Sequence, residues 1–183
     1  MSELALRRAV RVLRAGGIVA VPTEAVWGFS CDPYNRAAVE TLLRLKERDW
    51  RKGLIVVASE LDHLAGLIES PSAMALKRAK ATWPGAATWV FPAAPTAPML
   101  VSGEHDSVAV RLTAHPLLRA LCARWGGPLV STSANRAGQP PARSVSELRL
   151  RFGPALTVVP GALGGMSRPT SIREAATGHI LRR

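Results

Sequence analysis

LKERDWRKGLIVVAS, residues 45–59, joins a run of charged residues to the most apolar strand pattern in the chain. Its second half, LIVVA at residues 54–58, is short, rich in β-branched side chains and free of polar residues. Such a run is typical of a strand that is buried on both faces of its sheet. The charged run therefore lies at the rim of that sheet.

Helical and β-rich patterns alternate on both sides of this strand. Helices are expected at residues 3–15, after the capping residue Asn35, and at 59–68, 72–81, 116–125 and 145–152; strands are expected at 18–21, 88–91, 107–112, 128–131 and 156–159, with short β segments near 170–174 and 179–183. Ser59 and Asp62 have the spacing of a capping box, whereas PTEAVWGFSCDP (22–33) and the Pro-rich residues 92–100 are expected to form loops. This alternation predicts a single α/β domain over residues 1–183, in which helices flank a twisted, mixed β-sheet.

The arginine-rich start of the chain reads as the first helix rather than as a targeting segment. Leu4, Val10 and Leu13 follow a helical stripe that stops before two glycines. The chain has 183 residues, 48% of them hydrophobic, and its mean hydropathy is +0.11, which excludes a disordered chain. No apolar run approaches the ~20 residues of a membrane helix. We therefore expect a soluble globular protein that does not use a membrane.

The charge of the chain points to an anionic partner. The formal net charge is +11, from 24 basic and 13 acidic residues. A field of this sign favours phosphates, nucleotides or RNA, and arginine, which dominates the basic residues, binds phosphate in a bidentate way. The charge supports this class of partner without naming one.

Several kinds of site are not indicated. Cys31 and Cys122 lie far apart and outside any CxxC pattern, so we expect neither a disulfide framework nor a zinc site, and a reducing cytosol fits. The four histidines have no metal-ligand spacing. The chain also lacks a Walker A sequence, a GxGxxG turn and a GxSxG elbow. A nucleotide that binds here does not use a P-loop or a Rossmann turn.

Three polar segments adjoin buried strands, where ligand-binding loops of open α/β sheets usually lie. In PTEAVWG (22–28), Thr23 offers a hydroxyl and Gly28 permits close approach, although a plain strand-to-loop turn has the same pattern. The segment 45–54 places four cations within seven residues, which fits either a solvated helix end or a triphosphate site. In STSAN (131–135), Ser133 and Asn135 either cap a local turn or hydrogen-bond an anion. Arg111, at the end of the strand VAVR, either pairs with a buried carboxylate or receives one from a substrate.

Taken together, these segments resemble the YrdC-like family, in particular its short bacterial form. GGIVAVPTEAVWGFSCDP, LKERDWRKGLIVVAS, WPGAATWVFPA, SVAVRLTAHPL and PLVSTSANRAGQPP occur here in the order and spacing of that family, from about residue 8 to the end of the chain. The pair Lys46-x-Arg48 followed by Ser133-x-Asn135 is jointly specific. The resemblance implies a single YrdC-like domain with a basic concave face.

The resemblance also implies a reaction. L-Threonine, bicarbonate (or CO2) and ATP become L-threonylcarbamoyladenylate and pyrophosphate, so the chain is expected to be a nucleotidyltransferase. The adenylate then serves a threonylcarbamoyl transferase complex, which modifies adenosine 37 of tRNAs that read ANN codons. Mg²⁺ is expected to arrive with ATP, without a tightly held protein metal site, and the cytoplasm is the expected location.

The same resemblance assigns roles to individual residues. It implies that Lys46 and Arg48 are catalytic, and it divides the binding residues into an ATP set (Lys46, Arg48, Lys52, Ser133, Asn135 and Arg182) and a threonine set (Thr23, Arg111, Ser131 and Ser171). The chain departs from the family at Asp49-Trp50, where members often carry proline, so Asp49 is expected to moderate phosphate affinity or to pair with Arg51. Val57 stands where longer relatives have a histidine, which removes one expected threonine contact.

Two other functions compete with this one. The net charge also fits a non-catalytic protein that binds double-stranded RNA or tRNA in the same basic concavity. A generic ATP-dependent carbamoyl transferase would use the phosphate-binding residues but has no need of Thr23 and Arg111. Release of pyrophosphate that depends on threonine distinguishes the three functions.

Overall fold

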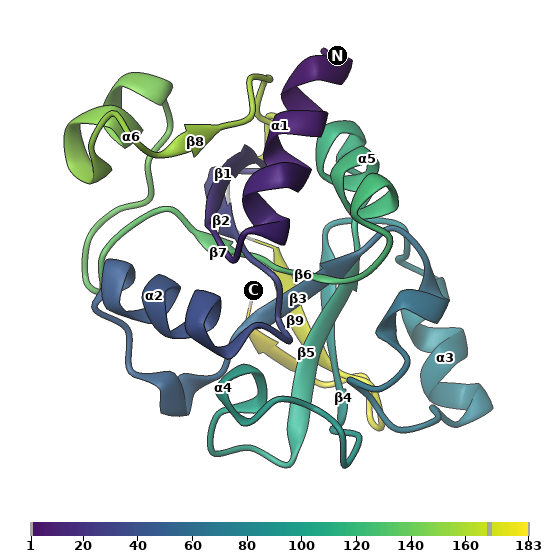
Figure 1. Cartoon of the computed structure of the whole chain (residues 1–183). Helices are drawn as coiled ribbons and strands as arrows, with labels where there is room; N and C mark the ends of the chain where they lie inside the picture. Colours follow the sequence, from purple (N-terminus) through teal and green to yellow (C-terminus); the bar gives the residue numbers. More distant parts are fainter. Residues whose placement is uncertain (1, 168–169, 183) are drawn as a thin grey trace.

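The computed structural model describes residues 2–167 and 170–182, in which helices pack around two β-sheets (Figure 1). The helices are α1 (Glu3–Arg14), α2 (Arg36–Lys46), α3 (Ala73–Lys80), α4 (Met99–Ser102), α5 (Pro116–Trp125) and α6 (Val145–Phe152), with 3₁₀ turns η1 (Trp50–Lys52) and η2 (Leu61–Leu64). The strands are β1 (Val19–Pro22), β2 (Trp27–Ser30), β3 (Ile55–Ala58), β4 (Ala87–Pro92), β5 (Ser107–Leu112), β6 (Leu129–Val130), β7 (Thr132–Ser133), β8 (Thr157–Val158), β9 (Ser171–Glu174) and β10 (Ile180–Arg182).

The strands form a four-stranded sheet of order β7-β2-β1-β8 and a six-stranded sheet of order β10-β9-β4-β5-β3-β6. Each sheet contains both parallel and antiparallel pairs. The mixed α/β class is therefore confirmed, with the strands divided between two sheets. The division arises at residues 128–133, because Val130 pairs with Val56 of the larger sheet whereas Thr132 pairs with Phe29 of the smaller one.

The first helix is confirmed and covers the four-stranded sheet together with α5. The Ser2 side chain accepts a hydrogen bond from the amide of Ala5 and caps α1, as expected for a serine in this position. The buried stripe of α1 packs with α5, β1 and the ends of β3 and β6 in one apolar cluster, whose members include Leu6, Val10, Leu13, Val19, Val57, Leu118, Leu121 and Leu129. Figure 1 shows α1 and α5 side by side.

Asn35 caps α2, as its sequence predicts, and this helix carries the charged run to the sheet rim. The Asn35 side chain accepts a hydrogen bond from the amide of Ala38. The helix buries Val39, Leu42 and Leu43 in a cluster that also contains Phe29 of the smaller sheet. It ends at Lys46, because Glu47 adopts a left-handed conformation with φ of 51°.

Three local expectations are wrong. The segment PTEAVWGFSCDP (22–33) is not a loop throughout, because Trp27–Ser30 form β2, which pairs with β1. Residues 59–68 do not form a helix with a capping box: the segment contains only the 3₁₀ turn η2, and Ser59 Oγ lies 3.3 Å from His63 Nδ1 instead of capping a helix. Within the Pro-rich segment, Met99 begins the short helix α4, whose first turn follows Pro98. In residues 62–67 the backbone closes turns between residues three positions apart, from Ala65 to Asp62 and from Leu67 to Leu64, and α4 is tied to Leu54, whose amide donates to the carbonyl of Val101.

The remaining core lies between the larger sheet and α3. Leu64, Leu67, Ala79, Trp83, Phe91 and Val110 are among its buried residues. Cys31 and Cys122 are both buried free thiols in the described structure. Among the described helices, none has the length and hydropathy to cross a bilayer.

Candidate functional site

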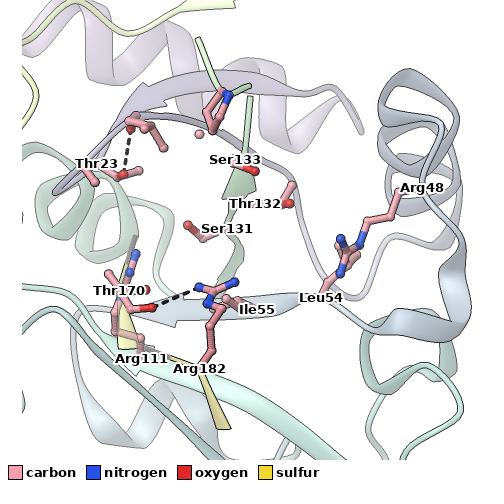
Figure 2. Close-up of a pocket in the computed structure, with 14 residues that line it drawn as sticks. Thr23, Arg48, Leu54, Ile55, Arg111, Ser131, Thr132, Ser133, Thr170 and Arg182 are labelled. Atoms are coloured by element: carbon pink, nitrogen blue, oxygen red, sulfur yellow. Dashed lines mark hydrogen bonds between the residues drawn. The ribbon is translucent and has the colours of Figure 1, made fainter. Parts of the chain in front are cut away.

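A cavity of about 180 Å³ lies between the two sheets (Figure 2). Both sheets contribute to its lining, together with the loop after β1 and the segment after α2. The lining residues are Thr23, Ala25, Val26, Gly28, Arg48, Leu54, Ile55, Arg111, Ser131, Thr132, Ser133, Pro141, Thr170 and Arg182. Residues far apart in the sequence meet here because the chain passes from one sheet to the other at Ser131. Six of the ten residues assigned to ATP or threonine line this cavity.

One wall of the cavity consists of hydroxyl groups from the STSAN segment. The amide of Ser131 donates to the carbonyl of Ile55 at 2.8 Å, which ties the segment to β3 before it joins β7. Figure 2 shows Ser131 and Ser133 projecting toward the centre of the cavity. Gly28 suits this close contact between β2 and β7, because a Cβ there would lie 3.2 Å from the carbonyl oxygen of Thr132 and 3.1 Å from Cγ2 of Thr23. A larger residue requires these neighbours to shift by a few tenths of an ångström.

Two guanidinium groups reach the cavity from different elements, Arg48 from the segment after α2 and Arg182 from β10 (Figure 2). Arg48 donates to the carbonyl of Gly53 at 3.0 Å and 3.3 Å, and Arg182 donates to the carbonyl of Thr170 at 3.0 Å. Burial and the charge of Arg182 lower the pKa of Arg48, and burial lowers the pKa of Arg182. Within the described part of the chain, neither group forms an ion pair with a carboxylate. The charge of Asp49 opposes the pKa shift at Arg48 only in part. Two neighbouring cations that make no ion pair with a described carboxylate favour an anionic ligand.

The acidic residues of the charged run point elsewhere. Asp49 pairs with Arg51 at 3.5 Å, and Arg51 also contacts Glu104 at 2.8 Å. Glu47 pairs with Arg136 at 3.1 Å. The expectation that Asp49 pairs with Arg51 is therefore confirmed, and both carboxylates of the run bind arginines that do not line the cavity.

Arg111 is buried at one end of the cavity, where it pairs with a carboxylate of the protein. Its Nη2 lies 3.3 Å from Oε2 of Glu24, and Oε1 of Glu24 accepts a hydrogen bond of 2.9 Å from Thr113. Burial lowers the pKa of Arg111, and the charge of Glu24 opposes this shift. Nearby, Thr23 donates its hydroxyl to the carbonyl of Val26 at 2.8 Å. The prediction that Arg111 pairs with a buried carboxylate is thus confirmed. Because Arg111 also lines the cavity, it is accessible to a ligand there.

The matching family model, Sua5/YciO/YrdC, bears the description "Telomere recombination" and covers residues 11–183. The chain belongs to the Sua5/YciO/YrdC family. The resemblance to YrdC-like proteins is therefore confirmed.

Curated relatives of the chain within this family are enzymes. A protein of Stenotrophomonas maltophilia named threonylcarbamoyl-AMP synthase is 52% identical over 185 residues, which span 100% of both chains. A protein of Chromohalobacter salexigens with the same name is 50% identical over 175 residues, or 96% of this chain and 95% of that protein. The expectation that the chain is an enzyme is confirmed at this level of identity.

The fold of the family is seen in a crystal structure of P. abyssi Sua5 complexed with L-threonine. It superposes with a TM-score of 0.88 at 27% sequence identity, over 95% of this chain and 52% of that chain. The present chain thus spans about half of that longer protein. In that crystal, L-threonine is the ligand of P. abyssi Sua5.

Lys46, to which the family resemblance gives a phosphate contact, does not line the cavity in the described residues. Its side chain is 3% exposed, and Nζ donates to the carbonyl of Ser133 and, at 2.9 Å, to the carbonyl of Asn135. Burial, and to a lesser degree the charge of Arg48, lower the pKa of Lys46 to about 8. Its contact with a phosphate stays a prediction.

Asn135, Lys52 and Ser171 also lie outside the described lining of the cavity. Asn135 accepts a hydrogen bond from the hydroxyl of Ser133 and donates to two carbonyls of its own loop, so it holds the loop together. Lys52 lines a second cavity of about 310 Å³, which shares Arg48, Leu54, Ile55 and Arg182 with the first. Ser171 begins β9 directly after Thr170, which does line the first cavity.

Two polar residues in or beside the cavity, Glu24 and Thr170, were not predicted from the sequence. Glu24 stands inside the PTEAVWG segment, but its charge was not matched to the arginine that ends β5. An acidic residue two positions after one buried strand and an arginine near the end of another are the signal for such a pair. Thr170 carried no signal, because a threonine before a short strand is common. Val57 is fully buried in the core and does not line the described cavity.

Proposed function

We propose that the protein synthesises threonylcarbamoyl-AMP. In this reaction the amine of L-threonine combines with CO2, derived from bicarbonate, to give a carbamate. A carbamate oxygen then attacks the α-phosphorus of ATP, the bond from the α-phosphorus to the bridging oxygen breaks, and pyrophosphate leaves. The names of the curated relatives and the threonine complex of P. abyssi Sua5 support this proposal.

The observation that carries the proposal is the pair Arg48 and Arg182, which face a wall of hydroxyl groups in one cavity. The two reactants are both anions, and two unit charges about 4 Å apart repel by about 4 kcal/mol at an effective dielectric constant of about 20. Cations fixed between them lower this cost, and they do so most where charge develops on the leaving pyrophosphate. Holding the reactants together supplies a further part of the rate. The reaction needs no nucleophilic side chain of the protein.

The residues divide into two groups along the cavity. Arg48 and Arg182 bind the ATP phosphates at the junction of the two cavities, with Lys52 on the side of the second cavity and Ser133 opposite. We expect Asn135 to serve this wall through its hydrogen bond with Ser133.

The threonine group lies at the other end of the cavity. Arg111 binds the threonine carboxylate while Glu24 holds its other side. Thr23 and Ser131 bind the remaining polar groups, with Ser171 as a further expected contact. The amine of threonine then faces the phosphates, where it forms the carbamate.

Magnesium enters this proposal as part of the substrate. The lining of the cavity offers hydroxyl and guanidinium groups, and the nearby carboxylate of Glu24 is already bound by Arg111 and Thr113. Among the described residues, no cluster of three or more His, Cys, Asp or Glu side chains forms a metal site. We propose that Mg²⁺ arrives on ATP, where it neutralises phosphate charge. The adenylate then supplies the threonylcarbamoyl group for adenosine 37 of ANN-reading tRNAs, through a transferase complex in the cytoplasm.

The test is a pyrophosphate assay with ATP, Mg²⁺, bicarbonate and one amino acid at a time. We expect release that requires threonine and bicarbonate together. Release with another amine supports a carbamoyl transferase with a different acceptor. An absence of release, combined with tight and salt-sensitive binding of RNA, supports a non-catalytic RNA-binding protein.

Neighbouring arginines offer a matched pair of variants for this assay. Arg48→Gln removes a cation from the cavity, so we expect kcat/KM for ATP to fall by about 100-fold or more. Arg51→Gln removes an equal charge three residues away, but Arg51 binds Asp49 and Glu104 outside the cavity, so its kcat/KM is expected to change less than about 3-fold. Equal losses in the two variants contradict the role of Arg48. Circular dichroism is the control that tests whether both variants are folded.

A further inference from the structure

The side chain of Lys46 joins the end of α2 to the STSAN loop. Lys46 is the last residue of α2, and its Nζ donates to the carbonyls of Ser133 and Asn135, 87 and 89 residues further along the chain. The same Nζ lies 5.9 Å from the centre of the Phe29 ring. With 3% of the residue exposed, this ammonium group has exchanged water for two carbonyl oxygens and an aromatic face.

Further contacts strengthen the same junction. The amide of Ala137 donates to the carbonyl of Lys46 at 2.8 Å. The side chain of Arg136 pairs with Glu47, the residue that follows Lys46, at 3.1 Å. The loop is therefore attached to the helix end by a main-chain contact at Lys46 and a side-chain contact at Glu47.

This junction determines how the two walls of the cavity face each other. Ser133, whose carbonyl Lys46 binds, belongs to the hydroxyl wall. Arg48, two residues after Lys46, belongs to the cationic side. Lys46 thus connects the two walls without itself lining the described cavity. It donates to the carbonyls of Ser133 and Asn135 at the point where the chain leaves β7 and these carbonyls need donors.

We propose that Lys46 is a positioning residue, whose ammonium group clamps residues 133–137 to α2 and thereby fixes the hydroxyl wall opposite Arg48 and Arg182. Lysine suits this role because it has a long apolar stem and three donors, which satisfy several carbonyl oxygens at once. The lowered pKa of Lys46 agrees with a buried group whose partners are carbonyl dipoles rather than anions. That the wall binds ATP phosphates rests on the proposed function, whereas the clamp itself does not.

The first experiment is amide hydrogen exchange in the absence of nucleotide, on Lys46→Met and Arg48→Gln. Methionine keeps the length and apolar packing of the lysine stem but cannot donate to the carbonyls. We expect the amides of Ala134, Asn135 and Ala137 to exchange at least about 10-fold faster in Lys46→Met and to keep their wild-type rates in Arg48→Gln. The amides of Val56 and Val110, in the centre of the larger sheet, report global stability and are expected to be unchanged in both variants.

The kinetics of the two variants complete this comparison. In Lys46→Met we expect a fall in kcat of at least about 10-fold, because the wall is no longer held opposite the cations. In Arg48→Gln we expect the larger change in the KM for ATP. Wild-type exchange of the loop in Lys46→Met, together with weakened ATP binding, overturns the proposal and makes Lys46 a direct phosphate contact.

A second experiment uses the wild-type chain, so it does not depend on the folding of a variant. The sequence contains four lysines, Lys46, Lys52, Lys77 and Lys80. Acetic anhydride at trace level reports the reactivity of each lysine with and without ATP and Mg²⁺. We expect Lys46 to react slowly in both conditions with a ratio near 1, while the more accessible Lys77 and Lys80 of α3 react freely in both.

A change of more than about 3-fold in Lys46 reactivity on addition of ATP overturns the proposal, because a clamping ammonium group stays buried on its carbonyls when phosphates bind. Failure of the proposed function has a different signature. In that case the pyrophosphate assay shows no threonine-dependent release, and Lys52 is not protected by ATP. The exchange difference between Lys46→Met and Arg48→Gln remains in that case, because it is measured without any substrate.

Discussion

Arg111 and Glu24 form the most deeply buried ion pair of the described residues, with side chains 5% and 9% exposed. A buried guanidinium is costly unless a carboxylate and hydrogen bonds compensate it. Glu24 supplies the charge, and Thr113 fixes the carboxylate through a hydrogen bond of 2.9 Å. The pair therefore lowers the cost of burying an arginine at one end of the cavity.

We expect Glu24→Gln to lower the free energy of unfolding by about 3 kcal/mol, because removal of one partner leaves a buried charge uncompensated. Urea denaturation monitored by tryptophan fluorescence measures this loss. Glu3→Gln is the control, since Glu3 also pairs with arginines but its side chain is 54% exposed, and its loss is expected to stay below about 1 kcal/mol. A loss below about 1 kcal/mol in Glu24→Gln contradicts a structural need for the pair.

Single residues were predictable from the sequence where their chemistry has few alternatives. An arginine at the end of a buried strand must meet a carboxylate, so both alternatives for Arg111 follow from its position in the sequence. Lys46 shows the opposite case. A lysine in a basic run has the same sequence pattern whether its ammonium group binds a phosphate or, as here, donates to main-chain carbonyls. Which carbonyls it reaches depends on how the strand after residue 128 is placed.

At the scale of elements, helix starts and strands were predictable because their signals are local. The cap at Asn35, the proline at the start of α5 and the alternation in β5 are each visible within a few residues of sequence. The switch of sheets at Ser131 has no local signal, since it depends on pairing with β3 and β2, about 75 and 100 residues earlier. The cavity is built at that switch, so its position could not be read from the sequence.

The segment 161–167 is a second element whose place depends on long-range contacts. The amide of Gly164 donates to the carbonyl of Thr23, and the amide of Met166 donates to the carbonyl of Glu24, both at 2.9 Å. These two bonds fix the position of the loop that carries Thr23 and Glu24. A Cβ at residue 164 would lie 2.8 Å from Cα and 2.9 Å from the carbonyl oxygen of Glu24, so only glycine permits this approach.

We expect Gly164→Ala to lower the free energy of unfolding by about 1–3 kcal/mol, because the methyl group meets backbone that cannot move aside. Amide exchange is expected to locate the damage at Met166, whose hydrogen bond to Glu24 is lost. Gly127→Ala is the control: its Cβ would meet only ordinary contacts with the Trp125 ring, and its effect is expected to stay below about 0.5 kcal/mol. If the Met166 amide of Gly164→Ala exchanges at its wild-type rate, the segment 161–167 is not closely packed against the loop that carries Thr23 and Glu24.

The whole molecule combines a general positive charge with a few cations inside a cavity, and these two features act on different ligands. The net charge of +11 was available from the sequence and indicated the class of ligand. It did not indicate where that ligand binds, because most arginines lie on the surface. Exposed charges are screened within about 8 Å at physiological ionic strength, whereas partly buried charges such as Arg48 are screened less.

Salt therefore separates binding of RNA from binding of ATP. For RNA, each phosphate contact adds close to one unit to the slope of log K against log salt, so we expect affinity for tRNA to fall at least about 30-fold between roughly 50 and 200 mM KCl. For ATP with Mg²⁺ we expect a fall of less than about 5-fold over the same range, measured by calorimetry. A variant of α1 with the exposed residues Arg8, Arg11 and Arg14 changed to Gln is expected to reduce the RNA slope and to leave ATP binding unchanged. Arg48→Gln is expected to weaken ATP binding and to leave the RNA slope unchanged. If one variant weakens both ligands equally, RNA and ATP share the cavity, and the surface charge is not a separate binding determinant.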